Sequence, residues 1–274
     1  MNQVELNPTF SRQYKYNAVF TLEKGFLSDV YFGIIYHILA IMKVAIAQIL
    51  RNPYALEENM QAHLHACRQA GEQAADLILF PELSLTGYNL LDTKRQAFTL
   101  DDHRLSPLQV LADEYNLTIV AGAPVRHTDR LLLASLILSP KQPISCYTKQ
   151  HLHGEEQKYF ETAPDLNPLL VIGGEKIALS ICADINYPEH SKAAMQREAT
   201  IYLSSIYFES YEMDKAHRQL AAHAKANQMK VLMANFTGTA DGRSAGGKSG
   251  WWNQEGKLMQ SLSPTEPELV VADI

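Results

Sequence analysis

The feature that most constrains this chain is an alternation of continuous apolar runs and amphipathic stretches after residue 42. The runs are rich in Val, Ile and Leu, which is typical of strands buried on both faces. They cover residues 43–49, 76–80, 117–123, 131–138, 176–182, 199–205 and 230–236. Apolar or Ala-rich stripes at helical spacing predict helices at about 55–72, 188–197 and 213–227. This alternation predicts one layered α/β domain over residues 42–274.

Residues 1–41 do not fit that pattern. Their apolar run continues from Val30 to Met42 and is interrupted only by His37. It is shorter than the roughly 18 residues that a membrane-spanning helix needs. It also begins too far from the N-terminus for a signal peptide. We therefore expect residues 1–41 to be an N-terminal extension of doubtful order, with Met42 as an alternative start, and we expect no membrane partner.

Charge and cysteine content exclude several classes of protein. Lys and Arg total 24 against 30 Asp and Glu, a net charge of −6, and no stretch concentrates basic residues. Nucleic acid is therefore not an expected partner. The three cysteines, Cys67, Cys146 and Cys182, are an odd number spread over a long chain. This argues against a disulfide framework and predicts a cytoplasmic protein, with Cys67 and Cys146 as core thiols.

Reactive side chains stand at three predicted strand ends, one of them the short stretch Tyr147-Thr148-Lys149, which is not among the apolar runs above. Cys182 ends one strand, and Pro188 stands where the next helix would begin, so the thiol lies at a strand-to-helix junction similar to a nucleophile elbow. Glu82 follows another strand through Pro81 and is suited to act as a base. Lys149 ends a third and is suited to stabilise an oxyanion. Taken singly, the three are also explained as a core thiol, a loop carboxylate and a solvated lysine.

Taken together, three short motifs in this order resemble the nitrilase superfamily of carbon–nitrogen hydrolases, in its amidase-like branch. The motifs are Phe80-Pro81-Glu82, Tyr147-x-Lys149-x-His151-Leu152 and Ile181-Cys182-x-Asp184-x-x-x-Pro188-Glu189. The resemblance spans about residues 43–261. It implies a four-layer αββα sandwich.

The resemblance also implies an activity and a role for each residue. The chain would be a hydrolase that cleaves a non-peptide carbon–nitrogen bond of a small-molecule amide, N-carbamoyl compound or nitrile. Cys182 would be the nucleophile that forms a thioester, Glu82 the general base and Lys149 the oxyanion stabiliser. The backbone N–H of Ala183 would assist Lys149, and Glu156, rather than Glu155, would orient the site. The scheme requires no metal and no organic cofactor, and members of the family often form homo-oligomers.

Two positions beside the nucleophile depart from the family pattern. Asn186 stands where many members carry arginine, and Ala183 where an aromatic residue is frequent. Because both flank Cys182, they bear on the choice of substrate more than on the reaction. We expect Tyr88, Asn186 and Tyr207, on loops between the predicted elements, to bind substrate.

Two other patterns suggest different functions. Residues 242–249 match the phosphate-loop pattern G-x-x-x-x-G-K-S, so the alternative is a P-loop nucleotide-binding protein. The sequence after Ser249, however, predicts a turn and a short strand instead of the helix that such a loop requires. His151 and His153 form an H-x-H pair, but no further ligand motif accompanies them. A metal site needs three or four converging ligands, so none is expected.

Overall fold

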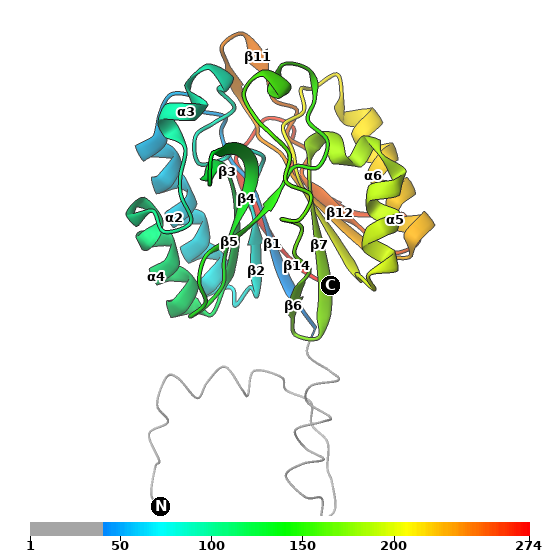
Figure 1. Ribbon diagram of the computed structural model, residues 1–274. Coiled ribbons are helices and arrows are strands. Elements are labelled where there is room, and N and C mark those ends of the chain that lie inside the picture. Colours follow the sequence, from blue (N-terminus) through cyan, green and yellow to red (C-terminus); the bar gives the residue numbers. More distant parts are fainter. Residues whose placement is uncertain (1–40) are drawn as a thin grey trace, which may run out of the picture. The chain divides into compact units, whose positions relative to one another are not determined.

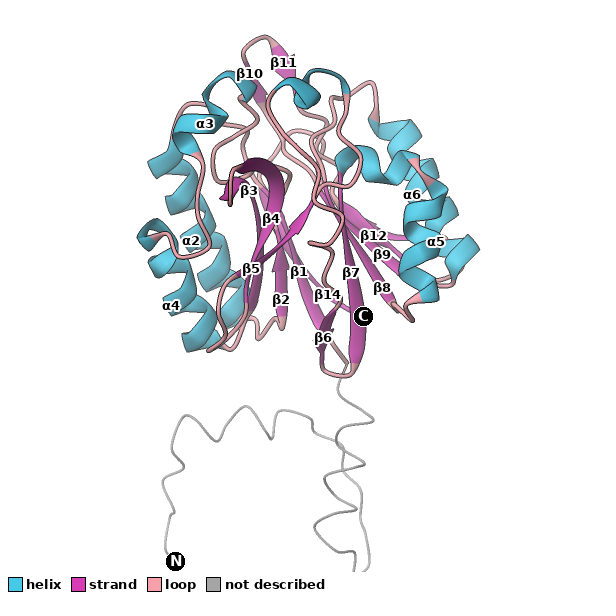
Figure 2. Ribbon diagram, in the orientation of Figure 1, coloured by secondary structure: helices cyan, strands magenta, loops and turns pink. Residues whose placement is uncertain are grey.

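The computed structural model describes residues 41–274, in which two six-stranded sheets face each other (Figure 1). The predicted extension 1–41 therefore lies outside the described residues, apart from Ile41. Figure 2 shows helices on the outer side of each sheet, so the layers follow the order helix, sheet, sheet, helix. This is the αββα sandwich that the motifs predicted.

The first sheet has the strand order β14-β1-β2-β3-β4-β5. Its strands are β1 (Lys43–Gln48), β2 (Leu77–Leu79), β3 (Thr118–His127), β4 (Arg130–Leu138), β5 (Ser145–Thr148) and β14 (Glu268–Asp273). β1, β2 and β3 are parallel, and β4 is antiparallel to both of its neighbours. β5 consequently runs in the same direction as β2, and the two strands end at the same edge of the sheet.

The second sheet has the order β13-β12-β9-β8-β7-β6. Its strands are β6 (Leu170–Ile172), β7 (Glu175–Ile181), β8 (Ile201–Ser205), β9 (Lys230–Ala234), β12 (Gly250–Trp252) and β13 (Leu258–Ser261). β7, β8 and β9 are parallel. Each sheet therefore has three parallel strands at its centre with antiparallel strands beside them.

Helices cover the outer face of each sheet. The first sheet is covered by α2 (Leu56–Glu72) and α4 (Ser106–Tyr115), and the second by α5 (Pro188–Gln196) and α6 (Met213–Asn227). Short elements complete the described chain: η2 (Leu90–Asp92), α3 (Thr93–Gln96), η3 (His103–Leu105), η4 (Gly154–Lys158), η5 (Cys182–Asn186), β10 (Thr239–Ala240) and β11 (Arg243–Ser244). Among residues 41–274, no helix is both long enough and apolar enough to cross a membrane.

The apolar strands are continuous because both of their faces are buried. In β1, Val44 and Ile46 belong to the core that also contains Leu179 of the other sheet, whereas Ala45 and Ala47 belong to the core that contains α2 and α4 side chains. Successive side chains of a strand point to opposite faces, so such a strand fills two cores at once.

The predicted elements agree with these strands and helices to within a few residues. The largest difference is β3, which continues to His127 because its second half pairs with β4 in a hairpin. The short strand expected after the turn that follows Ser249 is β13. Helix α4 and the antiparallel strands β6, β12 and β14 were not predicted. β6 and β12 have only three residues each, and β14 is partly exposed, so they lack the continuous apolar signal of the central strands.

Candidate active site

The carboxyl ends of β2, β5 and β7 place Glu82, Lys149 and Cys182 in one buried cluster. β2 and β5 end at the same edge of the first sheet, and Cys182 directly follows β7 of the sheet that faces it. The three predicted residues are thus contributed by both sheets. Two further residues, Glu156 of η4 and Tyr88, complete the cluster.

Lys149 forms ion pairs with two carboxylates. Its Nζ atom lies 2.7 Å from Oε1 of Glu82 and 2.7 Å from Oε1 of Glu156, and all three side chains are buried. Burial alone would lower the pKa of Lys149, but the carboxylate of Glu82, the Cys182 sulfur and Glu156 raise it above its usual value. Lys149 is therefore a permanent ammonium ion.

Glu82 is held at the start of a tight turn that continues to Thr86. Leu83 beside it has a positive φ of 51°, and a Cβ on Gly122 would lie 2.2 Å from the Leu83 nitrogen, so only glycine allows β3 to pack here. The Ser84 hydroxyl accepts a hydrogen bond from the Gly122 N–H (3.0 Å) and contacts Nε2 of buried His63 (2.9 Å). The turn that carries Glu82 is therefore fixed from behind by β3 and α2.

One oxygen of Glu82 is free. Oε2 is buried and has no hydrogen-bond partner among residues 41–274. Burial raises the pKa of Glu82 to about 7; the Lys149 ammonium opposes this shift, and Glu156 adds to it. The Cys182 thiol lies close enough to lower this pKa slightly. Glu82 can thus exchange a proton near neutral pH.

Glu156, in contrast, uses both oxygens. Oε1 accepts a hydrogen bond from the Tyr88 hydroxyl (2.7 Å) as well as from Lys149, and Oε2 accepts one from the His153 N–H (2.8 Å). Neighbouring Glu155 is exposed and pairs with Lys158 at the surface. The structure therefore places Glu156, and not Glu155, against Lys149.

Cys182 occupies a strained backbone position at the start of η5. Its φ is 45°, a left-handed conformation that is uncommon for residues other than glycine. Its Sγ lies 3.8 Å from the Tyr207 carbonyl oxygen. Burial and the charge of Glu82 raise the pKa of the thiol well above its usual value, although Lys149 opposes them. The resting thiol is therefore protonated. Ala183 is the next residue of η5, where backbone N–H groups have no partner within the helix.

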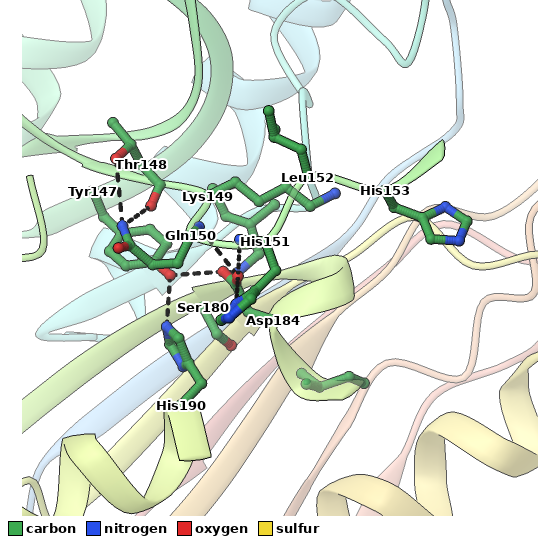
Figure 3. A network of polar contacts seen from close by, with 12 residues as sticks. Tyr147, Thr148, Lys149, Gln150, His151, Leu152, His153, Ser180, Asp184 and His190 are labelled. Atoms are coloured by element: carbon green, nitrogen blue, oxygen red, sulfur yellow. Dashed lines mark hydrogen bonds and ion pairs between the residues drawn. The ribbon is translucent and has the colours of Figure 1, made fainter. Parts of the chain in front are cut away.

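A second buried network lies beside this cluster and joins the Lys149 loop to η5 (Figure 3). Asp184 is fully buried and accepts hydrogen bonds from the Tyr147 hydroxyl (2.6 Å), the Ile181 N–H (2.9 Å), and the N–H groups of Gln150 (3.1 Å) and His151 (2.9 Å). Its Oδ1 also contacts Nδ1 of His151 (3.0 Å). Burial alone would raise the pKa of Asp184, but these hydrogen bonds hold it below its usual value.

The same network continues to the second sheet. His190 contacts the Tyr147 hydroxyl through Nε2 (2.9 Å) and the Tyr202 hydroxyl through Nδ1 (2.8 Å). Sequence reasoning gave no role to Asp184 and did not identify His190 or Tyr202. The signals for Asp184 were its position two residues after Cys182 and its place in the motif that continues to Pro188-Glu189.

A pocket of about 380 Å³ opens above Cys182. All three residues predicted to bind substrate, Tyr88, Asn186 and Tyr207, line it together with Ala183. Sequence reasoning missed most of the remaining lining, which lies largely between β8 and the middle of α6: Phe208, Glu209, Tyr211, Glu212, Lys215, Ala216, Gln219 and, from β11, Arg243. Their position after the carboxyl end of β8 was the available signal.

The two other sequence patterns lie in different surroundings. The segment 242–249 forms part of a two-stranded hairpin and a loop, and strand β12 follows Ser249 instead of a helix. The P-loop interpretation therefore lacks the structural context it requires. His151 contacts Asp184 and stacks on Tyr187, with ring centroids 3.8 Å apart. Within residues 41–274, no group of three or more His, Cys, Asp or Glu side chains could hold a metal ion.

Comparison with known proteins identifies relatives over nearly all of the described chain. The carbon–nitrogen hydrolase family model matches residues 43–274. A nitrilase of Pyrococcus abyssi is 26% identical over 238 residues, which cover 84% of this chain and 89% of the relative. An (R)-stereoselective amidase of a Pseudomonas species is 27% identical over 206 residues, 73% of each chain.

Solved structures of an amidase from Nesterenkonia sp. AN1 are similar in three dimensions. One of them, a variant with acrylamide added to the active-site cysteine, superposes with a TM-score of 0.78 at 26% identity. The superposition covers 85% of this chain and 93% of the amidase.

Proposed function

The chain belongs to the nitrilase superfamily of carbon–nitrogen hydrolases, in its amidase-like branch, and we propose that it hydrolyses a small-molecule amide through a thioester on Cys182. The observation that carries this proposal is a pocket-lining cysteine at a positive φ beside a buried carboxylate with one free oxygen. The Nesterenkonia amidase variants in complex with acrylamide and with butyramide support an amide as the substrate class.

The first half-reaction begins with a neutral thiol. As the Cys182 sulfur attacks the amide carbon, its proton passes to Glu82, whose free Oε2 is the acceptor. The carbon–sulfur bond forms, and the carbonyl oxygen becomes an oxyanion. Glu82 then gives the proton to the amide nitrogen, the carbon–nitrogen bond breaks, and ammonia or an amine leaves. A thioester remains on Cys182.

Lys149 and Ala183 stabilise the oxyanion in this scheme. An ammonium group has three N–H bonds, and Lys149 gives two of them to Glu82 and Glu156. The third remains for the substrate, and the backbone N–H of Ala183 supplies a second donor. Glu156 orients Lys149 because both of its own oxygens are engaged.

The second half-reaction uses the same base. Glu82 removes a proton from water, the hydroxide attacks the thioester carbon, and the carbon–sulfur bond breaks. The acid is released, and the sulfur recovers its proton. Tyr88, Asn186 and Tyr207, which line the pocket, contact the substrate.

An ammonia-release screen tests this function. Simple amides, ω-amides, N-carbamoyl amines and nitriles are incubated with purified protein, with and without an excess of chelator. We expect hydrolysis of at least one amide at the same rate in both conditions. Hydrolysis of nitriles alone would contradict the amide assignment. Activity that disappears with chelator and returns with zinc would contradict the cysteine mechanism.

We further propose that residues 42–274 form the catalytic domain of a cytoplasmic homo-oligomer. All three cysteines are unpaired and buried, which suits a reducing compartment. β1 begins at Lys43, and the Met42 carbonyl accepts a hydrogen bond from the Ile274 N–H. Deletion of residues 1–41 should leave melting temperature and turnover unchanged, and light scattering should give a mass above one chain. An insoluble truncated form would contradict the domain boundary.

A further inference from the structure

Arg51 is a buried cation that the catalytic scheme does not use. It follows β1, and its side chain is only 3% exposed. The Arg51 N–H donates to the Thr237 carbonyl (3.0 Å), and the Thr237 N–H donates to the Ile49 carbonyl (2.9 Å). β1 belongs to the first sheet, whereas Thr237 follows β9 of the second sheet. The backbone of Arg51 is therefore fixed where the two sheets are joined.

The guanidinium group contacts three segments that line the pocket. Nη2 donates to the Tyr88 carbonyl (3.2 Å), and Nη1 donates to the Ala240 carbonyl (2.6 Å) in the hairpin of β10 and β11. The Cζ atom lies 5.1 Å from the centroid of the Tyr207 ring. Of residues 41–274, those that line the pocket include Tyr88, Tyr207 and, from the same hairpin, Arg243, but not Arg51. These three lining residues form what we call the pocket wall, and Arg51 supports it from outside the pocket.

The pocket wall in turn contacts the catalytic cluster. The Tyr88 hydroxyl donates to Oε1 of Glu156 (2.7 Å), and the Tyr207 carbonyl oxygen lies 3.8 Å from Sγ of Cys182. The rings of Tyr88 and Tyr207 also contact each other, with centroids 5.0 Å apart. A displacement of the wall would therefore change the space that a substrate occupies above the nucleophile.

Stability alone does not explain a buried arginine at this position. Its charge partner, Asp241, lies 3.4 Å away and is 42% exposed, and Nε of Arg51 is buried with no hydrogen-bond partner within residues 41–274. Apolar side chains often replace buried ion pairs without loss of stability, and an unsatisfied buried N–H is unfavourable. Only arginine, however, supplies a planar fork of donors whose face can also lie over an aromatic ring. The side chain is therefore suited to fix the relative positions of the groups it contacts.

We propose, on the basis of the amidase function above, that Arg51 is a positioning residue that holds the pocket wall in the conformation that binds the amide. It acts through Tyr88, Tyr207 and the hairpin, and it does not touch the reacting atoms.

The reacting groups have other anchors, which separates their positions from that of the wall. Glu156 is also held by Lys149 and by the His153 N–H. The strand end that precedes Cys182 is held by Asp184. Loss of the guanidinium group should therefore weaken substrate binding more than it slows the chemical step.

Steady-state kinetics of two variants test the proposal. Arg51→Lys keeps the charge but not the planar fork, and Arg51→Met keeps only an apolar chain. The substrate is the amide that the ammonia-release screen shows to be hydrolysed fastest. We expect KM to rise about tenfold or more in both variants and kcat to change by less than about threefold, since hydrogen bonds to charged groups are the strong ones. Wild-type KM in the folded variants, or a loss of kcat at unchanged KM, would overturn the proposal.

Asp241→Asn is a milder variant that keeps the proposal testable if Arg51→Met does not fold. Asparagine retains an acceptor oxygen for the guanidinium group and tolerates the positive φ of 52° at this position. KM should rise in the same direction but less than in Arg51→Lys. Wild-type KM in both Asp241→Asn and Arg51→Lys would count against the proposal.

Arg104→Lys and Arg104→Met are the matched controls. Arg104 makes the same three kinds of contact, since it donates to the Ala97 carbonyl (2.7 Å), pairs with Asp102 and lies over the Phe98 ring (4.0 Å from Cζ to the centroid). Of the described residues that line the pocket, none belongs to this group. Both controls should retain wild-type KM and kcat even where the melting temperature falls. A KM raised as much as in the Arg51 variants would show that the effect is one of general stability.

Hydrogen exchange separates this proposal from the amidase function. Backbone N–H groups in the β10–β11 segment, such as that of Gly246, which donates to the Phe208 carbonyl (2.9 Å), should exchange faster in Arg51→Lys than in the wild type. Arg104→Lys should show wild-type exchange there. If no amide is hydrolysed but exchange is faster, the amidase function is wrong and Arg51 still holds the wall. If an amide is hydrolysed with wild-type KM and exchange is unchanged, the role of Arg51 is wrong and the amidase function stands.

Discussion

Two buried acidic networks lie side by side in this protein, and they differ in what is left unsatisfied. Around Lys149, the carboxylate of Glu82 has one oxygen with no partner in the described chain, and its pKa is raised to about 7. Around Asp184, both carboxylate oxygens accept several hydrogen bonds, and its pKa is lowered. Only the first network lines the pocket.

The difference separates a group that can react from a group that positions others. A carboxylate with a free oxygen and a raised pKa can take and return a proton near neutral pH. A carboxylate whose oxygens are all engaged stays ionised and holds its donors in place. In this protein those donors belong to the segment that carries Lys149 and to the strand end that carries Cys182. The following predictions test that distinction, starting with the largest effect.

Removing the nucleophile should abolish turnover and leave the fold intact. Cys182→Ala loses the sulfur that forms the thioester, and the alanine side chain fits the same space. We expect no measurable hydrolysis and a melting temperature near that of the wild type. In the wild type, brief iodoacetamide treatment followed by peptide mapping should place the first adduct on Cys182, because Cys67 and Cys146 are core thiols that do not line the pocket.

Cys146→Ala is the control for that experiment. It removes a buried thiol from the core beneath α2 and α4 and should retain turnover. Residual hydrolysis by Cys182→Ala, or a first adduct on either core cysteine while turnover persists, would show that the nucleophile is misassigned.

Replacing the base should cost roughly 100-fold to 10,000-fold in turnover, the usual range for general acid–base catalysis. In Glu82→Gln, an amide takes the place of the oxygen that would accept the thiol proton. For the wild type, kcat/KM should rise with pH and level off above about 7, where Glu82 is ionised. A profile that stays flat from pH 5 to pH 8, or a variant that remains fully active, would rule out Glu82 as the base.

Stability should show the same raised pKa. The folded state binds the Glu82 proton more tightly than the unfolded state does. The free energy of unfolding should therefore fall as pH rises from 4.5, the ordinary pKa of the side chain, to about 7, its pKa in the folded protein. Glu82→Gln should remove that slope. Denaturant unfolding at several pH values measures it without any dependence on activity.

Removing the ammonium should cost on the order of 100-fold in turnover, as the loss of one oxyanion donor typically does. Lys149→Ala also leaves Glu82 and Glu156 buried without their cation, which typically destabilises a protein by about 3–5 kcal/mol. Without the ammonium, Glu82 would bind its proton still more tightly in the folded state, so this variant should become more stable as pH falls toward 5. A variant with unchanged melting temperature and turnover would show that Lys149 is not part of the site.

The sequence predicted the first network better than the second, and the reason is physical. Glu82 and Cys182 follow continuous apolar strands, and Lys149 follows the short β5, so all three stand at strand ends that the topology brings together. Asp184 and His190 lie in helical segments, where no pattern in the sequence shows which side chain is buried. Their contact with Tyr147 depends on how η5 and α5 pack against β5, which is a tertiary property. The fold was predictable for the same reason as the site, because its central strands are buried on both faces.

The smallest effect on turnover is expected at Asp184. In Asp184→Asn the side chain keeps its shape, but an NH₂ group replaces one acceptor oxygen. If that group lies where Oδ2 was, the Tyr147 hydroxyl can rotate to accept from it, whereas the Ile181 N–H loses its acceptor. An unsatisfied buried donor costs about 1–3 kcal/mol, so the variant should be less stable than the wild type by about that amount. Turnover should fall about tenfold or less with KM nearly unchanged, because Lys149 and Cys182 remain present but are less well held.

The pH dependence of stability gives a second test of Asp184. The pKa of Asp184 is lowered in the folded state, so the contribution of Asp184 to stability is complete above the unfolded pKa of about 3.9 and is lost as pH falls through the folded pKa. The stability difference between wild type and variant should therefore be constant from pH 5 to pH 8 and shrink only in stronger acid, whereas the contribution of Glu82 changes between pH 4.5 and about 7. Ser249→Ala is the matched control, since it likewise leaves a buried backbone N–H, that of Asn235, without its acceptor, and Ser249 lies outside the Asp184 network. A loss of turnover as large as that of Glu82→Gln, with stability unchanged, would mean that Asp184 takes part in proton transfer and that the two networks are not separate.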